Sequence, residues 1–91
     1  MNVYLLMSKK EKSIQRLLSK PKDFSYEELK KLLGYLGYSE LSSGKTSGSR
    51  VAFFSETSAH MIRLHKPHPT NVLKRYQLDQ LIEELSLRGL L

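Results

Sequence analysis

The fold is decided by residues 50–65, which are Arg50-Val51-Ala52-Phe53-Phe54-Ser55-Glu56-Thr57-Ser58-Ala59-His60-Met61-Ile62-Arg63-Leu64-His65. Two runs rich in branched and aromatic residues, 51–55 and 60–65, flank the polar segment 56–59. Such residues favour strands, so the pattern predicts two strands joined by a turn. A four-residue turn pairs Ser55 with His60, and this pair sets the register of all the others.

That register divides the hairpin into two faces. One face pairs Phe53 with Ile62 and Val51 with Leu64, and we expect this apolar face to meet the helices. The opposite face carries the pairs Arg50–His65, Ala52–Arg63 and Phe54–Met61. The sequence therefore predicts a basic edge with aromatic and apolar neighbours on the outer face of the sheet.

Two helices are predicted before the hairpin. Each begins with a capping box, in which a serine side chain and the glutamate three residues later exchange hydrogen bonds with each other's backbone. The serine–glutamate pairs are Ser8–Glu11 and Ser25–Glu28. Pro21 should end the first helix, because proline lacks the backbone N–H. Apolar residues at helical spacing follow each box: Ile14, Leu17 and Leu18 in the first helix, and Tyr26, Leu29, Leu32, Leu33 and Leu36 in the second.

A last helix is predicted from Leu73 or Arg75 to Arg88, with Leu78, Leu81, Ile82 and Leu85 along one face. Residues 38–41 form a short predicted strand. The expected order is helix, helix, strand, strand, strand, helix. Helices grouped on one face of an antiparallel sheet give an α+β sandwich.

The composition indicates one small domain with a basic character. The chain has 91 residues, no cysteine and a formal net charge of +6. The absence of cysteine excludes disulfides and thiolate zinc sites. The first seven residues lack the features of a secretion signal, so we expect a cytoplasmic protein with no membrane segment. The charge favours a polyanion or an acidic protein as partner.

The positive charge gathers between residues 45 and 76. This window contains all three histidines and a single acid, Glu56. Its cations are Lys45, Arg50, Arg63, Lys66, Lys74 and Arg75. A cluster of one sign predicts phosphate binding, and the alternative is a set of solvated basic loops. Gly48 and Ser49 could bring backbone amides close to a phosphate, or they simply lead a loop into a strand.

His65 and His68 are the candidates for proton transfer, because imidazole titrates near neutral pH. RNA carries its own nucleophile, the 2′-hydroxyl group. Cleavage without metal then needs a base, an acid and cations around the phosphate. A structural or merely phosphate-binding role for the histidines is the alternative. His65 and His68 alone give incomplete metal coordination, so we expect no metal and no cofactor.

Four blocks of the sequence together resemble the HicA-type toxins (mRNA interferases) of prokaryotic toxin–antitoxin systems. The blocks are Gly34-Tyr35-Leu36-Gly37-Tyr38, Gly48-Ser49-Arg50-Val51-Ala52-Phe53, His65-Lys66-Pro67-His68-Pro69 and Leu73-Lys74-Arg75-Tyr76-Gln77. The likeness covers about residues 24–89. It implies a HicA-like domain over residues 24–91, and residues 1–23 are similar to the extension with a basic helix that some members carry.

The resemblance implies a fold like a double-stranded-RNA-binding domain. It also implies an endoribonuclease that cleaves mRNA without metal, and an antitoxin of the HicB type that covers the active surface. Many members have a catalytic histidine directly after Gly-Ser, where this chain has Arg50. Arginine can bind phosphate but cannot exchange protons at neutral pH. Either His65, its predicted cross-strand neighbour, takes that role, or the protein binds RNA without cutting it. A plain protein-interaction domain is a third hypothesis.

Overall fold

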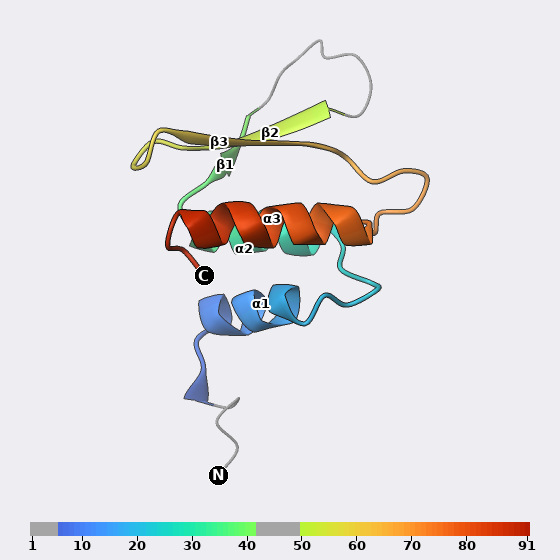
Figure 1. The fold of residues 1–91 in the computed structure, drawn as a ribbon, viewed down its shortest axis with the longest axis horizontal. Helices are drawn as coiled ribbons and strands as arrows, with labels where there is room; N and C mark the ends of the chain where they lie inside the picture. The colour runs from blue at the N-terminus through green and yellow to red at the C-terminus, as the bar shows by residue number, and fades with distance from the viewer. Residues whose placement is uncertain (1–5, 42–49) are drawn as a thin grey trace.

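A computed structural model describes residues 6–41 and 50–91 of the chain. In these residues it has three helices and a three-stranded antiparallel sheet (Figure 1). The elements in chain order are α1 (Lys9–Leu18), α2 (Tyr26–Tyr35), β1 (Ser39–Glu40), β2 (Arg50–Ser55), β3 (His60–His65) and α3 (Arg75–Leu87). The predicted order of elements and the coarse α+β class are confirmed.

Both predicted capping boxes are present. The Ser8 hydroxyl accepts from the backbone N–H of Glu11 at 3.1 Å, and the Glu11 carboxylate accepts from the N–H of Ser8 at 3.1 Å. Ser25 and Glu28 make the same exchange at 3.1 and 2.9 Å. These bonds satisfy N–H groups that have no partner inside a helix, and so they fix where α1 and α2 begin.

A glycine with a positive φ angle ends α2. Gly37 has φ of +94°, its N–H donates to the carbonyl of Gly34, and the N–H of Tyr38 donates to the carbonyl of Leu33 at 2.8 Å. This is the Schellman arrangement of a helix C-terminus. Because the N–H of Tyr38 is used by the helix, β1 begins at Ser39 and is shorter than the predicted strand 38–41. Gly89, with φ of +72°, ends α3 in the same way.

The register of the β2–β3 hairpin is the predicted one. Ser55 pairs with His60, Phe53 with Ile62, Val51 with Leu64 and Arg50 with His65. The strand order is β1-β2-β3, so β3 lies at one edge of the described sheet. Phe53 and Ile62 are each 1% exposed, which confirms that their face of the sheet packs on the core.

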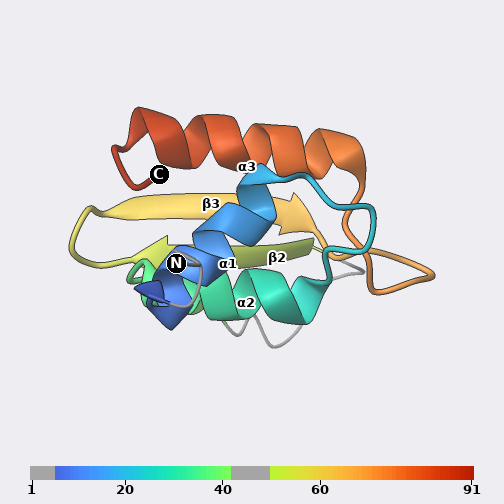
Figure 2. The same ribbon diagram turned by 90° about the horizontal axis from the view of Figure 1, so that it is seen from below.

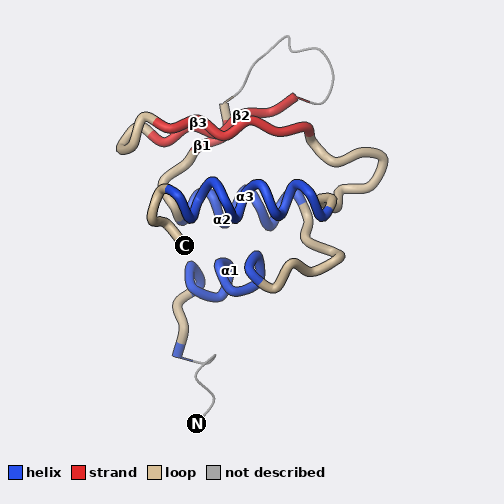
Figure 3. The backbone as a smooth tube through the Cα atoms, in the orientation of Figure 1, coloured by secondary structure: helices blue, strands red, loops and turns tan. Residues whose placement is uncertain are grey.

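The molecule has three layers. α2 and α3 lie side by side against one face of the sheet, and α1 packs beneath them (Figures 1 and 3). Figure 2 shows α1 crossing the helix pair, and its Leu17 is fully buried in the common core. Leu18 was expected in the same stripe but is 39% exposed, and Leu17 is the residue of α1 that is buried.

No element formed by residues 6–41 or 50–91 covers the other face of the sheet (Figure 1). Helices cover only the face that carries Phe53 and Ile62. The outer face is therefore open, so its side chains can contact a partner. In the same described residues, no helix has both the length and the apolar character that a membrane crossing requires.

Candidate nucleic-acid interface

The outer face of the β2–β3 hairpin presents three exposed basic or imidazole side chains. Arg50 and His65 are cross-strand partners, and Arg63 pairs with Ala52 on the same face. Ala52, Phe54 and Met61 are half-buried between them. This is the basic edge with apolar neighbours that the register predicted. Its charged groups are exposed to solvent, where a phosphate can contact them.

A cationic hollow opens where β3 ends and α3 begins. It has a volume of about 360 Å³. Its lining residues are His65, Lys66, Pro67, His68, Lys74, Tyr76 and Gln77. The first turn of α3 contains no acidic residue, so the partial positive charge of the helix N-terminus adds to these cations. The two candidate histidines and two of the candidate lysines therefore share one hollow.

Backbone pairing holds the loop that carries His68. Asn71 accepts from the N–H of Tyr26 at 2.9 Å, and Leu73 donates to the carbonyl of Phe24 at 2.8 Å. Gln77, which is 5% exposed, closes the other side by donating from Nε2 to the carbonyl of His65 at 2.9 Å. The loop is thus tied to both α2 and the end of β3, which fixes its path past the hollow.

Lys66, a predicted phosphate ligand, contacts an aromatic ring on the helix side of the sheet. Its ammonium lies 5.0 Å from the centre of the Tyr26 ring. There it faces Glu40, whose pKa is lowered chiefly by the hydrogen bond from the Tyr26 hydroxyl. Burial raises the pKa of Tyr26. Lys66 lines the cationic hollow but does not stand on the outer face.

Lys74 and Arg75 are two further predicted phosphate ligands. Lys74 is the N-cap residue of α3 and lines the cationic hollow. Arg75 lies 3.5 Å from Asp79, which also binds Lys20 at 2.8 Å, so Arg75 shares its carboxylate. Lys45, Gly48 and Ser49 lie outside the described residues.

His60 has partners that the sequence did not indicate. It is 7% exposed, its Nδ1 lies 2.6 Å from the hydroxyl of Tyr38, and its Nε2 lies 2.7 Å from Glu84. The three residues come from β3, the segment before β1 and α3. The alternation of β3 does place His60 on the helix side with Ile62, which was the only available sign that it belongs to the interior.

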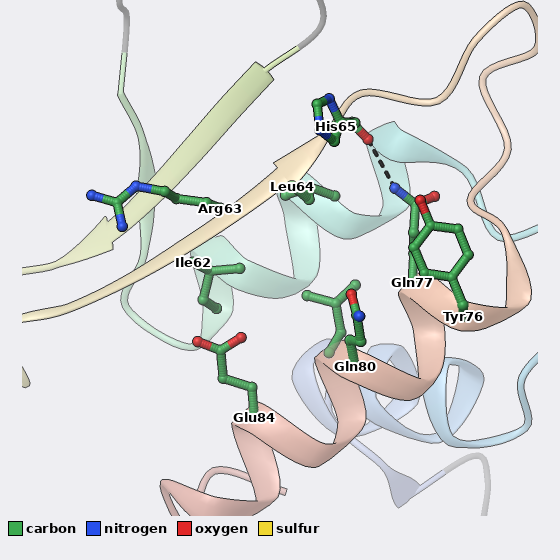
Figure 4. A pocket seen from close by; sticks show the side chains of 9 residues that line it. Ile62, Arg63, Leu64, His65, Tyr76, Gln77, Gln80 and Glu84 are labelled. Carbon is green, nitrogen blue, oxygen red and sulfur yellow. Dashed lines mark hydrogen bonds between the residues drawn. The ribbon is translucent and has the colours of Figure 1, made fainter.

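A second hollow, of about 140 Å³, lies between β3 and α3 (Figure 4). We call it the edge hollow. It shares His65, Tyr76 and Gln77 with the cationic hollow and extends past Arg63 to Glu84. Figure 4 shows the polar side chains of α3 lying along β3, with the bond from Gln77 to His65 at one end.

A third hollow lies on the opposite side of the molecule, between α1 and α2. Lys9, Lys12 and Lys31 line it. Arg16 also lines it, but its guanidinium is bound by Glu28 at 2.6 Å and by Asp23 at 3.0 Å. This surface is a competing place for an anion, and the two basic regions can be separated by substitution.

Two further findings concern metal binding and likeness to known proteins. Among residues 6–41 and 50–91, no three His, Asp or Glu side chains are grouped so that they could hold a metal ion. Comparison of the chain with models of protein families, with curated proteins and with solved structures gives no match in any of the three.

Proposed function

We propose that this protein is an RNA-cleaving toxin of the HicA type, which cuts mRNA in the cytoplasm without a metal and is inhibited by an antitoxin of the HicB type. One observation carries the proposal. His65 lies across from Arg50 on the open face of the sheet and lines the same hollow as His68 and Lys74. Proton-transfer groups and phosphate-binding cations therefore meet at one place.

The proposed reaction uses the 2′-hydroxyl group of the RNA as nucleophile. His65 removes its proton while the 2′-oxygen attacks the adjacent phosphorus. The bond from phosphorus to the 5′-oxygen breaks, and His68 protonates that leaving oxygen. Arg50 and Lys74 stabilise the charge on the phosphate during the transfer. The products are a 2′,3′-cyclic phosphate and a free 5′-hydroxyl group.

The arrangement of the chain supports this proposal. The described residues of this region, 26–41 and 50–87, follow the order helix, three antiparallel strands, helix, with both helices on one face of the sheet. That order is the one expected of a fold like a double-stranded-RNA-binding domain. The net charge of +6 suits an RNA substrate, and it equally suits an acidic antitoxin that covers the same face.

A second candidate is a non-catalytic RNA-binding module of the same fold. Arg50 motivates it, because this residue stands where the resembling family carries its catalytic histidine. An arginine there binds phosphate but removes no proton at neutral pH. Under this alternative, Arg50 and Arg63 hold the RNA backbone and His65 adds a hydrogen bond.

End-labelled mRNA incubated with the full chain in EDTA distinguishes the two candidates. The toxin proposal expects fragments with cyclic phosphate ends, and expects His65→Ala to abolish cleavage while RNA binding persists. Lys10→Ala is the matched control, because Lys10 is an exposed cation on α1 in the layer farthest from the sheet. Circular dichroism checks that each variant is folded.

Each outcome has a defined meaning. RNA that is bound but uncut by the wild-type chain supports the binding module. Full cleavage by His65→Ala contradicts the role given to that residue. RNA binding that is lost in Lys31→Ala but kept in Arg63→Ala moves the interface to the hollow between α1 and α2. Partner binding that does not weaken with salt indicates a protein-interaction domain instead.

A further inference from the structure

The edge hollow has an unusual set of polar side chains on one face of α3. Tyr76, Gln80 and Glu84 follow one another at intervals of four residues, which places them in a row along the helix. β3 forms the opposite wall, where Ile62 and Leu64 point toward α3, and Arg63 and His65 line the hollow from the same strand (Figure 4). Tyr76 is 53% exposed although it is a large ring. The catalytic proposal uses none of these three helix residues.

Glu84 is held in one orientation. Its Oε1 lies 2.7 Å from Nε2 of the buried His60, and Nδ1 of that ring lies 2.6 Å from the Tyr38 hydroxyl. When the proton of a neutral His60 is on Nε2, Tyr38 donates to Nδ1 and His60 donates to Glu84. The Glu84 side chain is 40% exposed, so its carboxylate is still accessible from the hollow.

These groups match the edge of a nucleobase better than they match a phosphate. A carboxylate repels phosphate but accepts hydrogen bonds from an amino group, as Glu does with cytosine N4. The amide of Gln80 both donates and accepts. An exposed tyrosine ring is a surface on which a base of single-stranded RNA stacks.

We propose that the edge hollow binds one base of a single-stranded RNA. Tyr76, about two helical turns away from Glu84 along α3, stacks on the neighbouring base of the strand. Glu84 accepts from the exocyclic amino group of the base in the hollow, so cytosine and adenine are preferred over uracil. Gln80 bonds the neighbouring position of the same edge. His60 and Tyr38 are positioning residues that hold Glu84. This inference rests on the proposed RNA binding and adds a sequence preference to it.

The position of the edge hollow fits this role. It shares His65, Tyr76 and Gln77 with the cationic hollow, so a base in one and its phosphate in the other occupy adjoining spaces. The residues that read the base then set which phosphate reaches His65. An extended peptide that pairs with the edge of β3 is the rival occupant. The row of polar side chains on α3, with its exposed tyrosine ring, suits a flat base better than it suits a peptide backbone.

Fluorescence anisotropy of the full chain with short oligomers of cytidine, adenosine or uridine tests the proposal. We expect the cytidine and adenosine oligomers to bind about tenfold more tightly than the uridine oligomer, as one well-made base contact provides. Tyr76→Ala should weaken all three by about tenfold, whereas Tyr76→Phe, which keeps a ring, should not. None of these variants changes a phosphate-binding cation, so the salt dependence of binding should stay the same.

Glu84→Gln is the sharpest variant. Its amide oxygen can still accept from His60, but the exposed group becomes an N–H donor in place of an acceptor. The preference should therefore move toward uridine, whose carbonyl oxygens accept. A thermal melt checks that the variant is folded, and Gln80→Ala at an exposed position gives a second reading if it is not.

The failures can be told apart. Equal binding of all three oligomers by the wild-type chain, unchanged in Glu84→Gln and Gln80→Ala, overturns the base-binding hollow and leaves RNA binding intact. Binding of none of the oligomers, or of mRNA, overturns the proposed function and this inference together. An extended acidic peptide is the remaining test. If it competes with the RNA oligomers and Tyr76→Ala does not affect that competition, the hollow is assigned to the rival occupant.

Discussion

Arg50 and His65 are cross-strand partners at the end of the β2–β3 hairpin that lies farthest from its turn. Both side chains are exposed on the face of the sheet that no described helix covers. Directly opposite residues of antiparallel strands have adjacent side chains. The guanidinium group and the imidazole group can therefore act on a single phosphate, one as a fixed cation and the other as a proton carrier.

Arg50→Ala is expected to weaken RNA binding and to flatten its salt dependence. Loss of one phosphate contact should reduce the slope of log affinity against log salt concentration by about 1. Filter binding or anisotropy over a range of salt concentrations measures this slope. Lys10→Ala removes the same charge on α1 and should leave the slope unchanged. Equal slopes for the wild type and Arg50→Ala would remove Arg50 from the interface.

Leu17→Ala should show whether α1 is part of the folding unit. Leu17 is fully buried in the common core, so its truncation is expected to reduce the free energy of unfolding by about 2–5 kcal/mol. Leu18→Ala, at the exposed neighbouring position, should change it by less than about 0.5 kcal/mol. Urea unfolding measures both. A small effect of Leu17→Ala would mean that residues 24–91 fold without help from α1.

Substitution of Gly37 and of Gly34 by alanine should change the stability of the protein in opposite directions. Gly37 has φ of +94°, where an L-residue is strained, so Gly37→Ala is expected to destabilise the protein by about 1–2 kcal/mol. Gly34 lies within α2, and a Cβ added there would meet nothing within 4 Å. Gly34→Ala should therefore stabilise the protein by about 0.5–1 kcal/mol. Shifts of the urea midpoint with opposite signs are the expected result.

Because Arg16 and Glu28 form an ion pair, we expect the protein to lose stability as the pH falls. The hydrogen bonds from Arg16 lower the pKa of Glu28, and the Glu28 carboxylate raises the pKa of Arg16. Because the pKa of Glu28 is lower in the folded state, its contribution is present above the unfolded-state pKa near 4.3. This contribution is lost as the pH falls through the folded-state pKa.

Glu28→Gln should accordingly lower the melting temperature at neutral pH, and the difference from the wild type should shrink as the pH falls below about 4. Melting curves across this range test the expectation. Glu83→Gln is the control, since Glu83 is an exposed acid on α3. A difference that stays constant with pH would assign the effect of Glu28→Gln to the helix cap, because that hydrogen bond does not require a charge.

Much of the fold could be predicted because its determinants are local. The capping boxes at Ser8 and Ser25 depend on a residue three positions away, and the register of the hairpin follows from the length of its turn. The pleat then decides that Phe53 faces inward and Arg63 outward. β1 begins later than predicted, because a helix-ending hydrogen bond from Tyr38 competes with strand pairing, and Leu18 is exposed although it was expected in the apolar stripe of α1.

Less of the candidate site could be predicted, because its contacts join residues that lie far apart in the sequence. The sequence by itself determined that Arg50, Arg63 and His65 share one face, since alternation along paired strands requires it. Only the tertiary structure decided that Lys66 contacts Tyr26, that His60 joins Tyr38 to Glu84, and that α3 lies along the edge of β3. Those contacts depend on how the helices pack across the sheet, which no local spacing encodes.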